Sequence, residues 1–221
     1  MDLHELKKQF IREESGISDT YGKVFSFIDF SNVNNWFKKD TQDWNNKLLA
    51  KDERLCIDIA NLKSFAGTFS QRVRVYYGED PKNPKSLKFT YVMRQVFGNR
   101  DVITKDLQKI KHYIELDESG SDAKYISTDE NGDLYVEIRK CNFDVEISVD
   151  VIKMMDHYDT FCLFSGDADF VYLNNFLRKR RKKVILIKGG YITTKLKESA
   201  DLVVNAQNIK RHIARIEKTK T

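Results

Sequence analysis

The sequence contains little proline and glycine, with two prolines and ten glycines among 221 residues. This composition excludes a collagen-like chain and a Pro/Gly-rich chain of low complexity. Long apolar runs are also lacking, and residues 1–8 contain no apolar segment. We therefore expect neither a secretory signal nor a membrane-spanning helix. The expected location is cytoplasmic, with no membrane contact.

Cysteine is scarce as well. The three cysteines, Cys56, Cys141 and Cys162, cannot all pair within one chain, and no two of them form a C-x-x-C pair. This pattern is typical of a reduced protein that uses cysteine mostly as a small hydrophobic residue. A zinc site is not expected.

Hydrophobic residues are plentiful, at 41% of the chain, and 12% of the residues are aromatic. So many aromatic residues argue against intrinsic disorder. The length is sufficient for one domain with a substantial core. The net charge of +5 permits a polyanionic partner without requiring one.

Short β-branched and aromatic segments alternate with segments of helical spacing. We expect strands at 24–28, 72–77, 161–164, 183–187 and 202–204, and helices at 44–65, 87–97, 143–155 and 170–180. Strands that alternate with helices of this length form βαβ units around a largely parallel sheet. The sequence therefore predicts the α/β class.

Residues 108–139 interrupt this alternation. They contain three strand-like segments, at 112–116, 124–127 and 134–138, and the turn Asn131-Gly132 favours a hairpin. We expect an antiparallel β extension at the edge of the sheet. It would be an insertion within a single domain of residues 1–221, whose core spans about 22–205.

Two segments are strongly basic. Residues 178–183 are all Arg or Lys, and residues 206–220 place basic side chains opposite isoleucines at helical spacing. The second pattern predicts a basic C-terminal helix at about 206–220. For both segments two interpretations stay open, a solvated helix face or a surface that contacts phosphates.

Aspartates follow several of the predicted strands. Asp29 ends the first strand, Asp167 and Asp169 follow the strand at 161–164, and Asp144 opens the helix at 143–155. The carboxyl ends of parallel strands form the usual ligand site of such sheets. Crowded carboxylates repel one another unless a cation compensates them, and Mg²⁺ and Mn²⁺ prefer oxygen ligands. The pattern therefore indicates metal-assisted phosphoryl chemistry.

Each aspartate also has a purely structural interpretation. Asp144 could stabilise a helix dipole, Asp167 could cap a helix, and Asp29 could form an Asx-turn. Asp150 lies about 120° around the helix from Asp144, which favours a structural role for Asp150.

The aspartates lie within motifs that resemble those of the NYN domain family, a branch of the PIN-like nuclease superfamily. The segment Ile28-Asp29-Phe30-Ser31-Asn32 resembles the D-x-x-N signature of the family, and residues 140–150 resemble its K-x-x-D-V-x-x-x-x-x-D element. Residues 165–170 resemble the S-G-D-[SA]-D-F element of the LabA-like subgroup. Leu196 with Ala200-Asp201 is similar to the closing L-x-x-x-A-D pattern.

This resemblance implies a PIN-like three-layer α/β/α fold and divalent-metal-dependent cleavage of RNA. The catalytic and metal-binding residues that it implies are Asp29, Asp144, Asp167 and Asp169. It further implies Asn32 and Ser165 as substrate-binding groups and Mg²⁺ or Mn²⁺ as the cofactor. The implied partner is RNA, single-stranded or structured, and a homodimer is left open.

The leading hypothesis is a metal-dependent endoribonuclease. One alternative is a non-catalytic RNA-binding NYN module with a residual metal pocket. Another is a small-molecule phosphohydrolase, but the aspartyl-phosphatase pattern requires a second carboxylate at the position of Ser31. Metal-dependent cleavage that is lost in Asp29→Asn, while binding survives, would separate the nuclease from the binding module.

Overall fold

A parallel β-sheet lies at the centre of the computed structural model, which describes residues 3–113 and 126–218. Its six strands are β1 (Val24–Asp29), β3 (Ser70–Glu79), β4 (Val102–Asp106), β8 (Thr160–Phe164), β9 (Lys183–Lys188) and β10 (Leu202–Asn205). They lie in the order β10-β9-β8-β1-β3-β4, and every neighbouring pair is parallel. All six carboxyl ends therefore lie along one edge of the sheet, which we call the carboxyl edge. The predicted α/β class with a mostly parallel sheet is confirmed.

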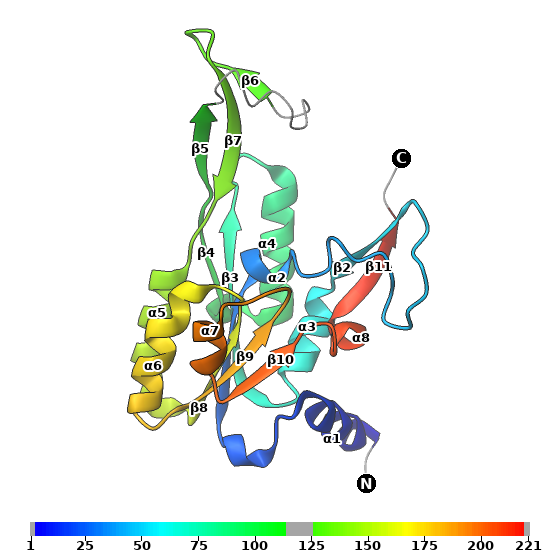
Figure 1. Cartoon of the computed structure of the whole chain (residues 1–221), viewed down its shortest axis with the longest axis vertical. Helices are drawn as coiled ribbons and strands as arrows, with labels where there is room; N and C mark the ends of the chain where they lie inside the picture. Colours follow the sequence, from blue (N-terminus) through cyan, green and yellow to red (C-terminus); the bar gives the residue numbers. More distant parts are fainter. Residues whose placement is uncertain (1–2, 114–125, 219–221) are drawn as a thin grey trace.

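Helices cover both faces of this sheet, because successive side chains along each strand point to opposite faces. Ile28 belongs to one buried hydrophobic cluster and Phe27 to the other. One cluster includes residues of α3 (Ile59–Ala66) and α4 (Pro84–Phe97). The other includes residues of α5 (Asp144–Lys153), α6 (Val171–Lys179) and α7 (Thr194–Glu198), as Figure 1 illustrates. The result is the expected PIN-like three-layer arrangement.

Three antiparallel strands form an arm that projects from the main body (Figure 1). They are β5 (Gln108–Tyr113), β6 (Ile126–Thr128) and β7 (Leu134–Lys140), in the order β5-β7-β6. The predicted antiparallel strands are thus present, but they form a sheet of their own instead of extending the edge of the central sheet. The parts of the predicted strands within 114–125 lie outside the described residues.

Two predicted helices are wrong for a shared reason. The segment predicted as a helix at 44–65 contains the strand β2 (Glu53–Ile57), and α3 begins only after Asp58, whose side chain accepts a hydrogen bond from the Asn61 N–H. The predicted C-terminal helix at 206–220 is reduced to α8 (Lys210–Ile213), followed by the strand β11 (Ala214–Lys218). β11 and β2 pair in antiparallel orientation. This pairing joins segments about 160 residues apart, so the local periodicity of either segment gives no sign of it.

Other elements had not been predicted. They are α1 (Leu3–Ser15), α2 (Phe30–Val33), α7, the strand β4, and the 3₁₀ turns Asp19–Tyr21, Asn99–Asp101, Met155–His157 and Ala168–Phe170. Within the described part of the chain, no helix has both the length and the apolar character needed to cross a bilayer.

Candidate metal centre

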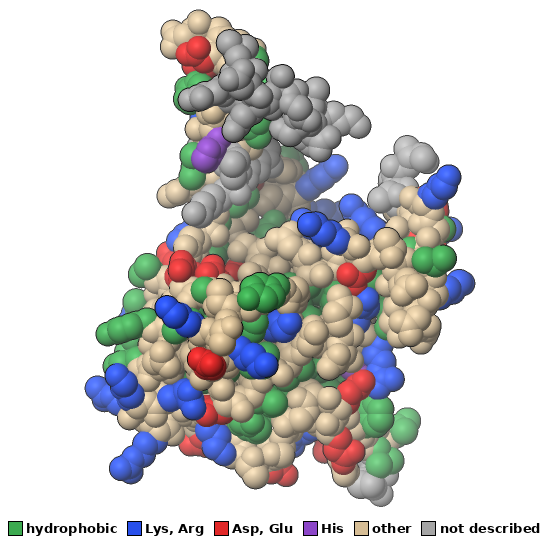
Figure 2. All heavy atoms as spheres, viewed as in Figure 1, with side chains coloured by type: hydrophobic (Ala, Val, Ile, Leu, Met, Phe, Trp, Pro, Cys, Tyr) green, Lys and Arg blue, Asp and Glu red, His purple; other side chains and the backbone are tan. Residues whose placement is uncertain are grey.

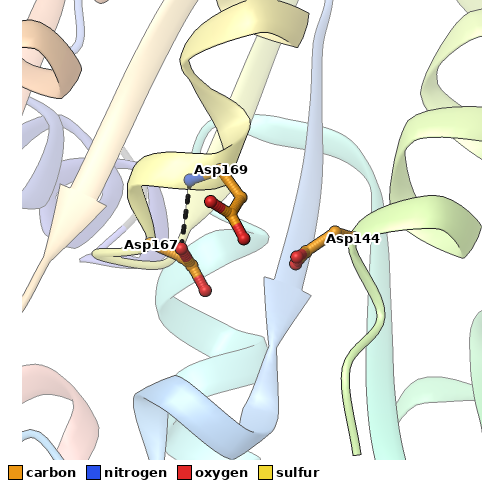
Figure 3. Close-up of side chains that lie close together, drawn as sticks. All are labelled: Asp144, Asp167 and Asp169. Atoms are coloured by element: carbon orange, nitrogen blue, oxygen red, sulfur yellow. Dashed lines mark hydrogen bonds between the residues drawn. The ribbon is translucent and has the colours of Figure 1, made fainter.

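Three carboxylates converge at the carboxyl edge, where β8 and α5 approach each other. Asp144 is the first residue of α5, Asp167 follows β8, and Asp169 lies in the 3₁₀ turn that leads into α6. One oxygen from each side chain lies within 4.8 Å of the others. Figure 3 shows the three carboxylates pointing toward one another from two separate elements. The structure thus brings together three of the four acids that the sequence singled out.

The backbone after β8 fixes the position of two of these acids. β8 is buried along its whole length, and the short segment of residues 165–167 then leads into the 3₁₀ turn Ala168–Phe170. The Asp167 side chain caps the following 3₁₀ turn by accepting a hydrogen bond from the Asp169 N–H at 3.0 Å. Ser165 Oγ accepts a hydrogen bond from the Asp167 N–H at 3.2 Å. Ser165 is fully buried, and this hydrogen bond helps to position Asp167.

Asp29 lies outside the group of three converging carboxylates. It is 7% exposed and caps α2, with Oδ1 accepting hydrogen bonds from Ser31 Oγ at 2.5 Å and from the Asn32 N–H at 3.4 Å. Its Oδ2 accepts a hydrogen bond from Ser165 Oγ at 3.4 Å. Through Ser165, Asp29 is therefore linked to the loop that carries Asp167.

The electrostatics of the cluster favour a bound cation. Burial raises the pKa of Asp29, against the hydrogen bonds that it accepts, and the charge of Asp167 raises it further. Burial also raises the pKa of Asp144, and the charges of the other three acids add to this effect. Among the side chains that the structure describes, no Lys or Arg forms an ion pair with any of the four. An uncompensated set of carboxylate oxygens fits a hard divalent cation such as Mg²⁺ or Mn²⁺.

Asn32 lies beside this cluster, and its amide orientation is defined by two donors. Its Oδ1 accepts hydrogen bonds from Trp36 Nε1 at 2.9 Å and from the Gly166 N–H at 3.2 Å. Both partners can only donate, so the amide atom that they contact must be the oxygen and not the nitrogen. The Nδ2 group is then the free donor end of the Asn32 side chain. Trp36 was missed in the sequence analysis, and its position four residues after Asn32 was the only local signal.

Two further acids have structural roles. Asp150 Oδ2 accepts hydrogen bonds from Arg74 Nη1 at 2.6 Å and from Tyr76 Oη at 2.8 Å. Asp201 Oδ2 accepts a hydrogen bond from the Val184 N–H at 2.7 Å, and its Oδ1 pairs with Arg178. Neither belongs to the group of three converging carboxylates.

Known proteins resemble this chain in sequence and in fold. It is 28% identical over 96 residues to the low amplitude and bright protein LabA of Synechococcus elongatus, a match that covers 43% of this chain and 50% of LabA. The match thus spans only half the length of that relative. A crystal structure of a Vibrio parahaemolyticus protein of unknown function superposes with a TM-score of 0.54 at 22% identity, covering 85% of this chain and 94% of the other. This likeness supports the fold alone.

The family assignment rests on a match along most of the chain. The model of the NYN domain matches residues 23–207, which include β1, β10 and all four aspartates of the candidate centre. This range also contains the arm between β4 and α5. The chain therefore belongs to the NYN domain family, within the PIN-like nuclease superfamily.

Proposed function

We propose that this protein is a divalent-metal-dependent endoribonuclease that hydrolyses RNA phosphodiester bonds at the carboxyl edge. The observation that carries the proposal is the convergence of Asp144, Asp167 and Asp169 within 4.8 Å, with no Lys or Arg partner among the described side chains. Such a site is costly without a cation and suited to one. The membership in a nuclease superfamily gives further support.

The side chains at this site have different proposed roles. Asp144, Asp167 and Asp169 offer the oxygen ligands, and a bound Mg²⁺ or Mn²⁺ would lower the pKa of the attacking water and polarise the phosphodiester. The Nδ2 group of Asn32 is available to donate a hydrogen bond to a non-bridging phosphate oxygen. Asp29 and Ser165 hold the loop of Asp167 in place through their hydrogen bonds.

The decisive test is to incubate the purified protein with end-labelled RNA in the presence of Mn²⁺, Mg²⁺ or EDTA. We expect internal cleavage with metal and none with EDTA. Asp167→Asn should remove cleavage while RNA binding persists, because a charged carboxylate ligand is replaced by a neutral amide. The matched control is Asp201→Asn, which changes the same charge at a residue outside the centre.

Two results would contradict the proposal. Cleavage that persists in EDTA would exclude a metal-dependent reaction. RNA binding without cleavage under any metal condition would instead favour a non-catalytic RNA-binding module. Parallel incubation with single-stranded DNA separates a ribonuclease from a nuclease that accepts both polymers.

A further inference from the structure

A hollow of about 620 Å³ adjoins the candidate metal centre and shares Asn32 with it. Its lining includes Asn32, Trp36, Lys38, Lys39, Gly189 and Asn205. We call it the lysine groove. It is formed by the loop after α2 together with the segments that follow β9 and β10, so it lies along the carboxyl edge of the sheet.

The lysine groove lies close enough to the metal centre for one polymer to occupy both. The strands β8, β9 and β10 are consecutive neighbours in the sheet. Adjacent strands are about 4.8 Å apart, so the end of β10 is roughly 10 Å from the end of β8. A polynucleotide that runs along this edge from Asp167 toward β10 would pass directly over the groove.

The charge of the groove is positive. Lys38 and Lys39 are exposed, and neither forms an ion pair with any described side chain. The acid in the lining, Asp40, is already compensated, because its Oδ2 accepts from Lys210 Nζ at 2.5 Å and from Gln207 Nε2 at 3.0 Å. Figure 2 shows Lys and Arg side chains on the same face of the molecule as the acidic group below the arm. The two lysines are therefore available to a polyanion.

One wall of the groove contacts residues beside the metal centre through Trp36. The Trp36 ring stacks on Phe164 at the end of β8, with the ring centroids 6.4 Å apart, and its Nε1 donates to Asn32. It also packs on Gly189, where a Cβ atom would lie only 2.4 Å from Trp36 Cδ1. A polynucleotide in the groove would therefore touch Trp36, which is hydrogen-bonded to Asn32.

An exposed aromatic ring follows the groove wall. Tyr191 comes directly after Gly190, a lining residue, and its side chain is 90% exposed. A ring so exposed has no role in the hydrophobic core. Exposed aromatic rings beside cationic grooves bind the unstacked bases of single strands, whereas duplex bases are hidden from them.

We infer that the lysine groove binds the single-stranded polynucleotide that flanks the phosphodiester at the metal centre. Lys38 and Lys39 contact backbone phosphates, and Tyr191 stacks on a base. This inference deepens the proposed nuclease function, because it assigns the path of the substrate strand along the carboxyl edge. RNA and single-stranded DNA share the chemistry that these residues recognise.

The test measures binding in EDTA, so that no cleavage is required. Fluorescence anisotropy of short labelled single-stranded RNA and DNA is recorded across a salt series for wild type and for Lys38→Gln/Lys39→Gln. The double variant should bind more weakly, and the slope of log K against log salt should fall by about 1.4, at about 0.7 per phosphate contact. Tyr191→Ala should weaken binding about fivefold or more with the slope unchanged.

The matched control is Lys153→Gln/Lys179→Gln, which removes the same charge at the ends of α5 and α6 far from the carboxyl edge. We expect it to bind short strands as wild type does. An equal effect of the two double variants, tighter binding of duplex than of single strands, or no binding by wild type would overturn the inference. Lysine-dependent binding without any metal-dependent cleavage would overturn the proposed nuclease function and leave the groove assignment standing.

Discussion

At the scale of single residues, the carboxylates of the candidate centre repel one another, and a bound cation would relieve this repulsion. Asp29 is almost completely buried, and Asp144 faces two other carboxylates from the opposite side of the cluster. Both pKa values are raised above the ordinary value of a carboxyl group. The charged forms of these residues therefore oppose folding in the absence of metal.

Replacing Asp144 should separate metal binding from stability. In EDTA, Asp144→Asn should raise the midpoint of thermal unfolding by about 2–4 °C for each kcal/mol of relieved repulsion. Mn²⁺ should raise the midpoint of wild type and have little effect on the variant, because the variant lacks one ligand. Differential scanning fluorimetry with and without Mn²⁺ provides the measurement. An identical Mn²⁺ shift in both proteins would exclude Asp144 as a ligand.

The raised pKa of Asp29 predicts a specific pH dependence. Below the ordinary Asp value of 3.8 the carboxyl group is protonated in both the folded and the unfolded state, and its charge carries no penalty. As the pH rises from 3.8 through the raised value of the folded state, the penalty grows and then stays constant. The stability advantage of Asp29→Asn over wild type in EDTA should grow with pH in the same window. Urea unfolding of both proteins between pH 4 and pH 8 measures this difference, and a constant difference would contradict the raised pKa.

At the scale of elements, the turns at the carboxyl edge position the functional side chains. The turn after β8 carries Asp167 and Asp169, and the turn after β9 supports Trp36. These turns are held by short-range hydrogen bonds and by close packing on the central strands. The chemistry of the site thus depends on loops whose geometry the sheet fixes.

A methyl group at Gly189 should disturb this edge. The new Cβ atom would lie 2.4 Å from Trp36 Cδ1, so the indole must move. We expect Gly189→Ala to lower the free energy of unfolding by about 1–3 kcal/mol, as overpacking typically does, and to weaken RNA binding through Asn32. Urea unfolding and anisotropy provide the two measurements. Gly190→Asn is the control for the unfolding measurement, because this position has φ +65°, no atom within 4 Å of a built Cβ, and a backbone conformation that Asn tolerates.

At the scale of the whole molecule, the two edges of the sheet carry different side chains. The carboxyl edge holds the acids and the lysine groove. The basic run at residues 178–183 lies at the far end of α6, about 13 Å along the helix from its start. Part of this run supports the fold, since Arg178 pairs with Asp201 and Lys182 Nζ donates to the Tyr158 carbonyl.

The remaining cations of the run should affect only long substrates. Lys179→Gln/Arg181→Gln should weaken the binding of long RNA and flatten its salt dependence, because distal phosphate contacts are lost. Binding and cleavage of a short oligonucleotide should stay unchanged. Equal losses on short and long RNA would place these residues at the site or in the fold. Filter binding across a salt series measures the first effect, and gel analysis of the cleavage products measures the second.

The features that local sequence patterns encode could be predicted without the structure. Alternation of buried strands and amphipathic helices predicted the α/β class, because burial on both faces of a parallel sheet gives the strands a distinctive composition. The aspartates at the end of β1 and after β8 were found because a parallel sheet collects its strand ends at one edge. The motif S-G-D-A-D-F at residues 165–170 indicated the family.

Contacts between segments that lie far apart in the sequence could be seen only in the folded chain. The pairing of β2 with β11 turned two predicted helical segments into strands, since hydrogen bonds between distant segments outweighed their local helical spacing. The burial of Ser165 and of Asp29 depends on how β1 and β8 pack. The lysine groove joins the loop after α2 to the ends of β9 and β10, and its residues come together only because the strand order differs from the chain order.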